Sequence, residues 1–159
     1  MMDSMADTRW LDAGEQRAWR AFVAAGQGLF DQLDRELQRD AGMPHTYYQI
    51  LVNLSEAPGR TLRMHELAER TSSSRSRLSL AVARLEERGW VRRRSCPTDR
   101  RGALAVLTDE GFAALRAAAP GHVEGVRAHL FDRLSPAQVA QLREISEAVL
   151  SPPGRRRTG

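Results

Sequence analysis

The stretch LAERTSSSRSRLSLAVARLEERGWVRRRSCPTDRRGALAVLT, residues 67–108, decides the fold of this 159-residue chain. A short helical segment from Met64 to Thr71 leads into three serines, and serine is a favourable residue for starting a helix. The helix that follows extends to about Arg88. Its apolar residues recur at i, i+4 and i+7, a spacing that predicts one buried face: Leu78, Val82 and Leu85.

A β-hairpin is predicted directly after this helix. Gly89 suits the left-handed conformation that ends helices. Trp90 to Arg94 and Ala103 to Leu107 read as strands, and Cys96-Pro97-Thr98-Asp99 between them has the residue types of a turn. The order of helix, serine-rich turn, helix and hairpin is that of a winged helix-turn-helix, whose second helix enters the major groove of DNA.

Two helical segments precede this stretch. An apolar stripe at helical spacing begins after Glu15 and ends at Gly42, and its members are Trp19, Phe22, Val23, Leu29, Phe30, Leu33 and Leu37. The next helix begins at Pro44 and ends at Ala57-Pro58-Gly59. Thr61-Leu62 is a short segment that can form a small strand.

Two more helices are predicted after the hairpin. Thr108 starts a long helix that Pro120-Gly121 kinks or interrupts. Ser135-Pro136-Ala137-Gln138 has the pattern of a capping box and starts the last helix, whose apolar face includes Ile145. The fold class is therefore mainly α with a small β-hairpin wing. We expect a flexible N-terminal tail over residues 1–13 and a disordered C-terminal tail over residues 151–159.

The positive charge of the chain is concentrated in its middle. The net charge is +4, and all 24 basic residues are arginine. By count, residues 1–40 carry 5 Arg and 8 acids, whereas residues 60–101 carry 12 Arg and 5 acids. A genome rich in G and C explains the choice of Arg over Lys but not this distribution. A basic block between nearly neutral arms indicates a module that binds a polyanion, with double-stranded DNA as the expected partner.

The exposed residues around the start of the second motif helix are the expected contacts to the major groove. They are Ser74, Arg75, Ser76, Arg77 and Ser79, with Arg84 and Arg88 further along and better placed for the phosphate backbone. Arginine can bind guanine through two hydrogen bonds, and serine can bind bases or phosphates. Arg100 and Arg101 at the hairpin tip suit the minor groove. The alternative is a solvated helix face, but no acidic residue intersperses Ser72 to Arg84, so Arg75, Arg77 and Arg84 are expected to lack acidic neighbours.

From Leu67 through Val91 the chain resembles the MarR family of transcriptional regulators. The wing gives the more specific match, because Asp99-Arg100-Arg101, five residues and then Leu107-Thr108 fit that family's D-x-R-x5-L-T pattern. The segment Thr108 to Gly111 is also similar to the family's sequence. The resemblance covers roughly residues 15–150 and implies a MarR-like winged domain over residues 14–150, with a DNA-binding part at about 44–108.

The resemblance also implies an obligate homodimer, a ligand-responsive repressor and a pseudo-palindromic operator. Helices at about residues 15–41 and 109–150 would interleave to form the dimer. Arg101 would enter the minor groove and Asp99 would orient it, unless Asp99 is a plain turn residue. The chain departs from the family's usual pattern at Leu80 and Ala83, where polar residues are common. Leu80 either meets a thymine methyl group or packs inward.

The family resemblance suggests a pocket for a small aromatic or phenolic effector. The candidate residues are Trp19, Arg20, His45, Tyr47 and Tyr48. Buried aromatic residues more often belong to a core, but the adjacent rings of Tyr47 and Tyr48 cannot both face one core. The effector's identity is not readable from the sequence, and neither are the target genes.

Other classes of function lack support in the sequence. Cys96 is the single cysteine, so a redox role has no resolving partner within the chain. His122 and His129 are two helical turns apart, which is too far for one metal ion, and no cofactor is expected. No catalytic motif and no membrane span is recognisable. We expect a cytoplasmic protein that is not an enzyme; the alternative is a winged-helix module that binds proteins without reading DNA.

Overall fold

The computed structural model describes residues 8–96 and 99–151, apart from the side chains of residues 99–101. The elements in chain order are α1 (Ala13–Ala41), α2 (His45–Glu56), the 3₁₀ turn η1 (Pro58–Arg60), β1 (Thr61–Arg63), α3 (Met64–Arg70), α4 (Arg75–Glu87), β2 (Val91–Cys96), β3 (Asp99–Leu107), α5 (Asp109–His129), the 3₁₀ turn η2 (Phe131–Arg133) and α6 (Pro136–Leu150). The predicted class, mainly α with a hairpin wing, is confirmed. The predicted tails fall largely outside the described residues.

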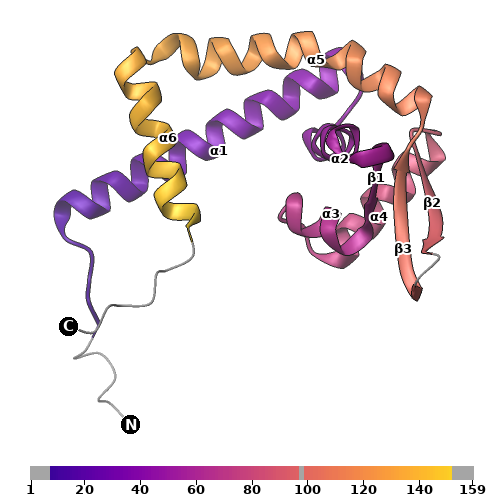
Figure 1. Ribbon diagram of the computed structural model, residues 1–159. Coiled ribbons are helices and arrows are strands. Elements are labelled where there is room, and N and C mark those ends of the chain that lie inside the picture. Colours follow the sequence, from indigo (N-terminus) through magenta and orange to yellow (C-terminus); the bar gives the residue numbers. More distant parts are fainter. Residues whose placement is uncertain (1–7, 97–98, 152–159) are drawn as a thin grey trace.

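The chain divides into a lobe and an arm, as Figure 1 shows. The lobe consists of α2, α3, α4 and the sheet. The arm consists of the long helices α1 and α5 together with α6, and α5 leads from the sheet to α6. At the crossing of α1 and α5, a Cβ atom on the buried Gly125 would lie 2.6 Å from Glu36 Oε2. Glycine therefore permits the two helices to approach closely.

The sheet has three strands, not only the two of the predicted hairpin. Its order is β1-β3-β2, and both pairs are antiparallel. The expected short strand at Thr61-Leu62 exists and pairs with Val106 and Ala105 of β3. Both hairpin strands are longer than predicted, and their register shifts between Ser95 and Cys96. The β1 strand anchors the base of the wing to the helices of the lobe.

The helix ends follow the capping residues of the sequence. Gly42 ends α1 in the left-handed conformation, at φ 58°. The Ser135 hydroxyl and the Gln138 side chain form the predicted capping box of α6. Helix α5 continues through Pro120, so an interruption there is excluded, although the ribbon bends along its length (Figure 1). A bend is expected because proline lacks the donor for one helical hydrogen bond.

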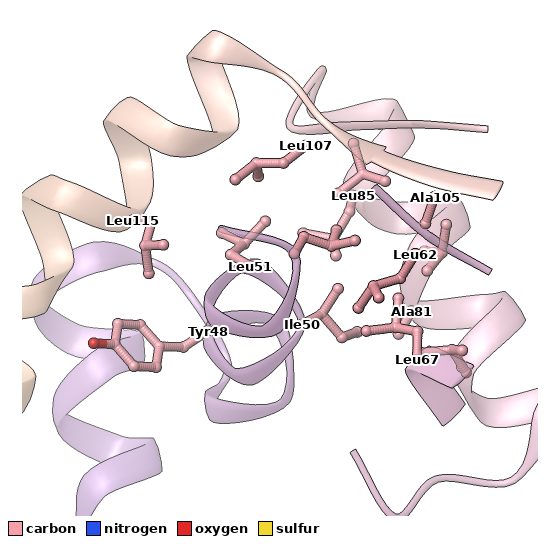
Figure 2. Packing of buried hydrophobic residues seen from close by; sticks show 14 of the residues in the cluster. Tyr48, Ile50, Leu51, Leu62, Leu67, Ala81, Leu85, Ala105, Leu107 and Leu115 are labelled. Atoms are coloured by element: carbon pink, nitrogen blue, oxygen red, sulfur yellow. The ribbon is translucent and has the colours of Figure 1, made fainter. Parts of the chain in front are cut away.

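The hydrophobic core lies in the lobe and the adjoining turns of α1 and α5. Figure 2 shows side chains of α2, α3, α4 and the sheet meeting there. Ile50, Leu51 and Leu54 are 0% exposed, and the predicted buried stripe of α4, including Leu78 and Leu85, faces the same core. In contrast, α6 contains no buried residue. No helix among the described residues is long and apolar enough to span a membrane.

Candidate nucleic-acid interface

The N-terminus of α4 is exposed and basic. Ser74 is its N-cap and accepts a hydrogen bond from the Arg77 backbone nitrogen at 3.3 Å. Arg75, Ser76 and Arg77 are exposed in the first turn, which contains no acidic residue. A helix N-terminus presents backbone N–H groups to anions. The predicted contact residues Ser74 to Arg77 are thus brought together on one accessible surface.

Leu80 lies on this surface and does not pack inward. Its side chain is 63% exposed, whereas Leu78 is 1% exposed and Val82 is 0% exposed. The sequence left two possibilities for Leu80, and its exposure excludes the second one, burial in the core.

The expectation that Arg84 lacks an acidic neighbour is wrong. Its Nη1 atom lies 2.9 Å from Glu87 Oε2, because residues three apart face each other on a helix. Arg88 is also engaged within the chain. It donates from Nη1 to the Gly42 carbonyl oxygen at 2.9 Å, and its guanidinium lies 4.9 Å from the Trp90 ring centroid. Arg88 therefore links the end of α4 to the end of α1 and does not point away from the chain.

Ser79 is half-buried and hydrogen-bonded to the wing. Arg93 of β2 donates from Nη2 to the Ser79 carbonyl oxygen at 2.5 Å and approaches the Ser79 hydroxyl at 3.3 Å. The Arg93 Nε atom lies 3.2 Å from Glu86 Oε2, and its backbone nitrogen donates to Glu86 Oε1 at 2.8 Å. Arg93 thereby fastens the wing to α4. From the sequence, Arg93 is recognisable only as part of the basic block, since no local pattern pairs a strand residue with the preceding helix.

The wing residues Asp99, Arg100 and Arg101 form the first part of β3. The backbone of Asp99 pairs with Cys96 at the tip of the hairpin. The side chains of these three residues lie outside the described part of the structure, so the expected interaction of Asp99 with Arg101 stays a prediction. Cys96 itself is buried, at 6% exposed.

The effector candidates do not form one site within a single chain. Trp19 is 58% exposed and contacts Phe22, with ring centroids 6.5 Å apart. Phe30, which contacts His45, follows Trp19 by about 16 Å along α1 at the usual helical rise. Arg20 is exposed beside Trp19. The structure thus separates Trp19 and Arg20 from the residues of α2.

The tyrosine pair behaves as predicted. Tyr48 is 8% exposed and belongs to the core, whereas Tyr47 is only half-buried and lies 5.6 Å from the Arg88 guanidinium. One ring faces the core and the other lies near the surface.

Histidines join the arm to the lobe. The His122 ring of α5 lies 5.5 Å from the His45 ring and 4.3 Å from the Tyr48 ring of α2. Burial lowers the pKa of His122, and the neighbouring His45 lowers it further. Burial also lowers the pKa of His45. Both imidazoles are therefore held toward their neutral forms.

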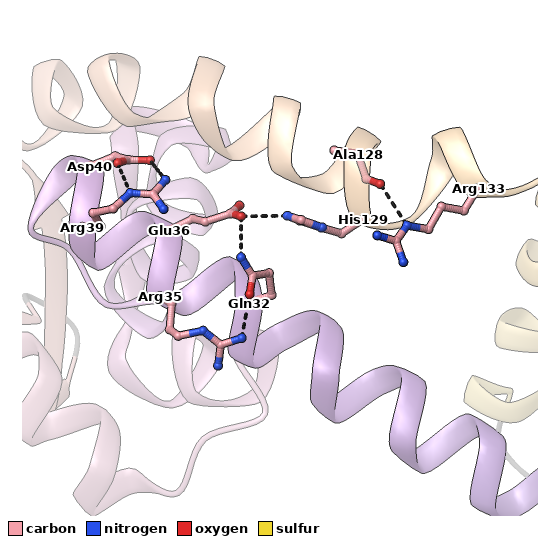
Figure 3. Close-up of polar contacts among 8 residues, drawn as sticks. All are labelled: Gln32, Arg35, Glu36, Arg39, Asp40, Ala128, His129 and Arg133. Carbon is pink, nitrogen blue, oxygen red and sulfur yellow. Dashed lines mark hydrogen bonds and ion pairs between the residues drawn. The ribbon is translucent and has the colours of Figure 1, made fainter.

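A polar cluster on the arm joins α1 to α5 (Figure 3). His129 Nε2 is 2.7 Å from Glu36 Oε1, and Gln32 donates to the same oxygen at 2.7 Å. The hydrogen bonds from Gln32 and His129 lower the pKa of Glu36. The spacing of His122 and His129 in the sequence raises only the question of a metal site, and it does not predict these contacts with distant parts of the chain. Among the described residues, no group of three or more His, Cys, Asp or Glu could hold a metal ion.

Comparisons with known proteins agree on one family. Residues 41–102 match the model of the MarR family. The chain is similar to the crystal structure of Sco3205 from Streptomyces coelicolor, a MarR family transcriptional regulator in complex with DNA. The identity is 56%, the match covers 94% of this chain and 96% of that one, and the TM-score is 0.87.

Two further relatives are informative. AbsC from Streptomyces coelicolor, a MarR family transcriptional regulator, is 43% identical, with 89% of this chain and 95% of that chain covered and a TM-score of 0.83. The transcriptional repressor MprA from Escherichia coli strain K12 is 30% identical over 110 residues, which are 69% of this chain. That match spans 62% of the length of MprA.

Proposed function

Because this chain belongs to the MarR family, we propose that it is a transcriptional regulator that binds double-stranded DNA sequence-specifically. The exposed first turn of α4 carries this proposal. Ser74 to Arg77 gather there, and neither Arg75 nor Arg77 forms an ion pair with any acidic side chain that the structure describes. The relative Sco3205, which is similar over nearly its whole length, was crystallised in complex with DNA.

The proposed contacts divide between the two grooves. Helix α4 enters the major groove, where the first-turn residues Ser74 to Arg77 contact bases and phosphates. Arg100 and Arg101 reach the minor groove from the wing tip, and Asp99 orients Arg101. Ser79 and Arg84 contribute less, because each already has a partner within the chain.

We propose a homodimer formed by the arm. Large apolar side chains of α1 and α6 are exposed there, including Phe22 at 65%, Ile145 at 60% and Val149 at 75%. Large apolar side chains that are exposed together on one surface are typical of an interface with another protein. A second copy covers it and places two α4 helices on one side of the DNA. The operator is then a pseudo-palindrome with half-sites about 10 base pairs apart.

Repression released by a small aromatic effector is the proposed mode of regulation, in the cytoplasm and without catalysis. The residues His45, Tyr47 and Tyr48 lie where α2 meets the arm. Trp19 and Arg20 can join them only from a second copy. The MprA relative is named as a transcriptional repressor, which supports this mode.

Selection of binding sequences from random DNA tests the proposal. We expect one pseudo-palindromic sequence, protected by the protein in footprinting. Arg75→Ala should then change base preference at about 1–3 kcal/mol for a lost two-bond contact. Arg101→Ala should weaken binding and reduce the slope of log K against log salt by about 0.9, because one positive charge that neutralises a phosphate is lost. Failure to enrich any sequence would favour a winged-helix module that binds proteins.

A further inference from the structure

Leu80 is an unusual residue for its location. Among the described side chains of residues 42–108, it is the one large apolar side chain that is mostly exposed, at 63%. The other large apolar side chains with high exposure lie on or beside α1, α5, η2 and α6, where a second copy is proposed to cover them. Leu80 instead lies on the basic face of α4, so the arm interface does not explain it.

Helix geometry places Leu80 at the centre of the exposed face of α4. Successive residues turn by about 100° around a helix. The buried residues Leu78, Ala81, Val82 and Leu85 define one side, and Leu80 projects nearly opposite to their mean direction. Ser76, one turn earlier, and Ala83, one turn later, share this outward side. Arg77 and Arg84 lie on one flank and Ser79 on the other.

Small neighbours surround Leu80 on this outward side. Ser76 is exposed and Ala83 is half-exposed, and both have short side chains. A base edge can therefore approach Leu80 closely, while the flanking Arg77 is free of described acidic partners and can contact phosphates. In the proposed complex, the exposed face of α4 lies in the major groove, and Leu80 is at the centre of that face.

We propose that Leu80 is a specificity-determining residue that contacts the 5-methyl group of a thymine in each half-site. This inference rests on the proposed binding of DNA. In the major groove, the thymine methyl group is the one apolar group that the four standard bases present. Leucine has no hydrogen-bond donor or acceptor, so a guanine, cytosine or adenine edge at this position would lose hydrogen bonds to water without replacement.

Uracil substitution isolates the proposed contact, because uracil pairs as thymine does and lacks only the methyl group. Each thymine of the selected operator is replaced by uracil, symmetrically in both half-sites, and the dissociation constant is measured by fluorescence anisotropy. For the wild-type protein we expect one symmetric pair to weaken binding by about fifteenfold. This corresponds to about fourfold for each half-site, or about 0.8 kcal/mol for one buried methyl group.

Two variants assign the effect to Leu80. Leu80→Ala should bind the thymine and uracil operators equally, because it removes the apolar partner of the methyl group. Leu80→Met keeps an apolar side chain of similar size and should remain sensitive to uracil. The exposure of Leu80 makes a folding defect unexpected in either variant, and circular dichroism checks this.

The outcomes distinguish a failure of the proposed DNA binding from a failure of the proposed Leu80 contact. If the wild-type protein selects no sequence, the proposed function itself is wrong. If it selects an operator in which every thymine tolerates uracil, DNA binding stands and the role of Leu80 is wrong. Undiminished sensitivity to uracil in Leu80→Ala would assign the methyl contact to another residue and also overturn the inference.

Discussion

The lobe and the arm of this chain both contain amphipathic helices but differ in what the apolar side chains of those helices contact. In the lobe, Ile50, Leu51 and Leu54 of α2 are fully buried by neighbours within the same chain. In the arm, α6 buries no residue, and Val149 and Leu150 are 75% and 82% exposed. Amphipathic helices thus bury their apolar side chains within the chain in the lobe and leave many of them exposed in the arm.

This difference indicates that the lobe and the arm have different roles, in positioning α4 and in association. The lobe has enough internal contacts to hold α4 and the wing in a fixed relation. The exposed apolar side chains of the arm would be buried only by the proposed second copy, and apolar burial is the dominant favourable contribution to folding and association. In the proposed dimer, the arm sets the spacing between the two α4 helices, and the lobe sets the position of α4 relative to the wing.

Introducing a charged residue into the apolar face of α6 should have the largest effect on operator binding. Ile145→Asp is expected to convert the proposed dimer into monomers, because a buried and unpaired carboxylate is strongly unfavourable. Loss of the second half-site contact should weaken operator binding by about 10²- to 10⁴-fold through lost avidity. Analytical ultracentrifugation and anisotropy measure the two effects.

Ala140→Asp is the matched control for this prediction. By helical geometry, Ala140 lies on the side of α6 opposite the apolar residues, and it is exposed. It should leave both the mass and the affinity near those of the wild-type protein. A monomer from both variants would show that general damage to α6, and not its apolar face, causes dissociation.

Truncation of a buried residue in the lobe should lower the free energy of unfolding and should not dissociate the proposed dimer. Leu54→Ala is expected to reduce the free energy of unfolding by about 2–5 kcal/mol, because Leu54 is 0% exposed and the change leaves a cavity. Leu80→Ala, the same truncation at a 63% exposed position, should change it by less than about 0.5 kcal/mol. Urea denaturation at fixed protein concentration compares them, and equal losses would contradict the assignment of the core to the lobe.

The elements of the lobe could be predicted from the sequence because their signals are local. The buried stripe of α4, the Ser74 cap and the glycine after α4 each depend on residues within about two turns. The hairpin was recognised for the same reason. Its pairing with β1 adds a third strand, and that contact joins residues far apart in the sequence, which no periodicity encodes.

The candidate site was less predictable, because side-chain partners are not fixed by spacing alone. Arg84 was expected to lack an acidic neighbour, yet Glu87 lies one helical turn away and pairs with it. The i, i+3 spacing of Arg84 and Glu87 in the sequence is sufficient to predict this pair. The interaction of Arg93 with Ser79 and Glu86 depends instead on how the hairpin folds back on α4.

That interaction yields the next prediction, at the join between wing and helix within the lobe. Arg93→Ala should lower the free energy of unfolding by about 1–3 kcal/mol, the usual cost of losing hydrogen bonds that involve a charged group. It should also weaken operator binding, because the wing is no longer held at a fixed distance from α4. Chemical denaturation and anisotropy provide the two measurements.

Arg93→Lys separates charge from geometry. Lysine keeps the positive charge but lacks the planar fork that reaches Ser79 and Glu86 together. We expect it to recover only part of the lost stability. Full recovery would mean that net charge near Glu86, and not the two-sided contact, holds the wing.

The smallest predicted effect concerns the junction where the lobe meets the arm. Burial lowers the pKa of both His122 and His45 in the folded chain. The charge of Asp34 opposes the shift of His45. For His122, the charge of His45 lowers the pKa further and that of Glu36 opposes the shift. Below pH 6.5, their ordinary pKa, the unfolded chain therefore binds protons that the folded chain does not. The free energy of unfolding must fall as the pH falls from 6.5 toward the folded-state pKa.

His122→Phe should make this fall shallower, because phenylalanine keeps a ring against Tyr48 and cannot be protonated. One group can contribute at most about 1.4 kcal/mol per pH unit, so the difference in slope must be smaller than that. Tyr48→Phe, which retains the ring and both histidines, should leave the slope unchanged in this range. Urea denaturation between about pH 5.5 and 7.5 measures the slopes. An identical slope in His122→Phe and the wild-type protein would mean that the junction is insensitive to the charge of His122, and that lobe and arm are coupled by packing alone.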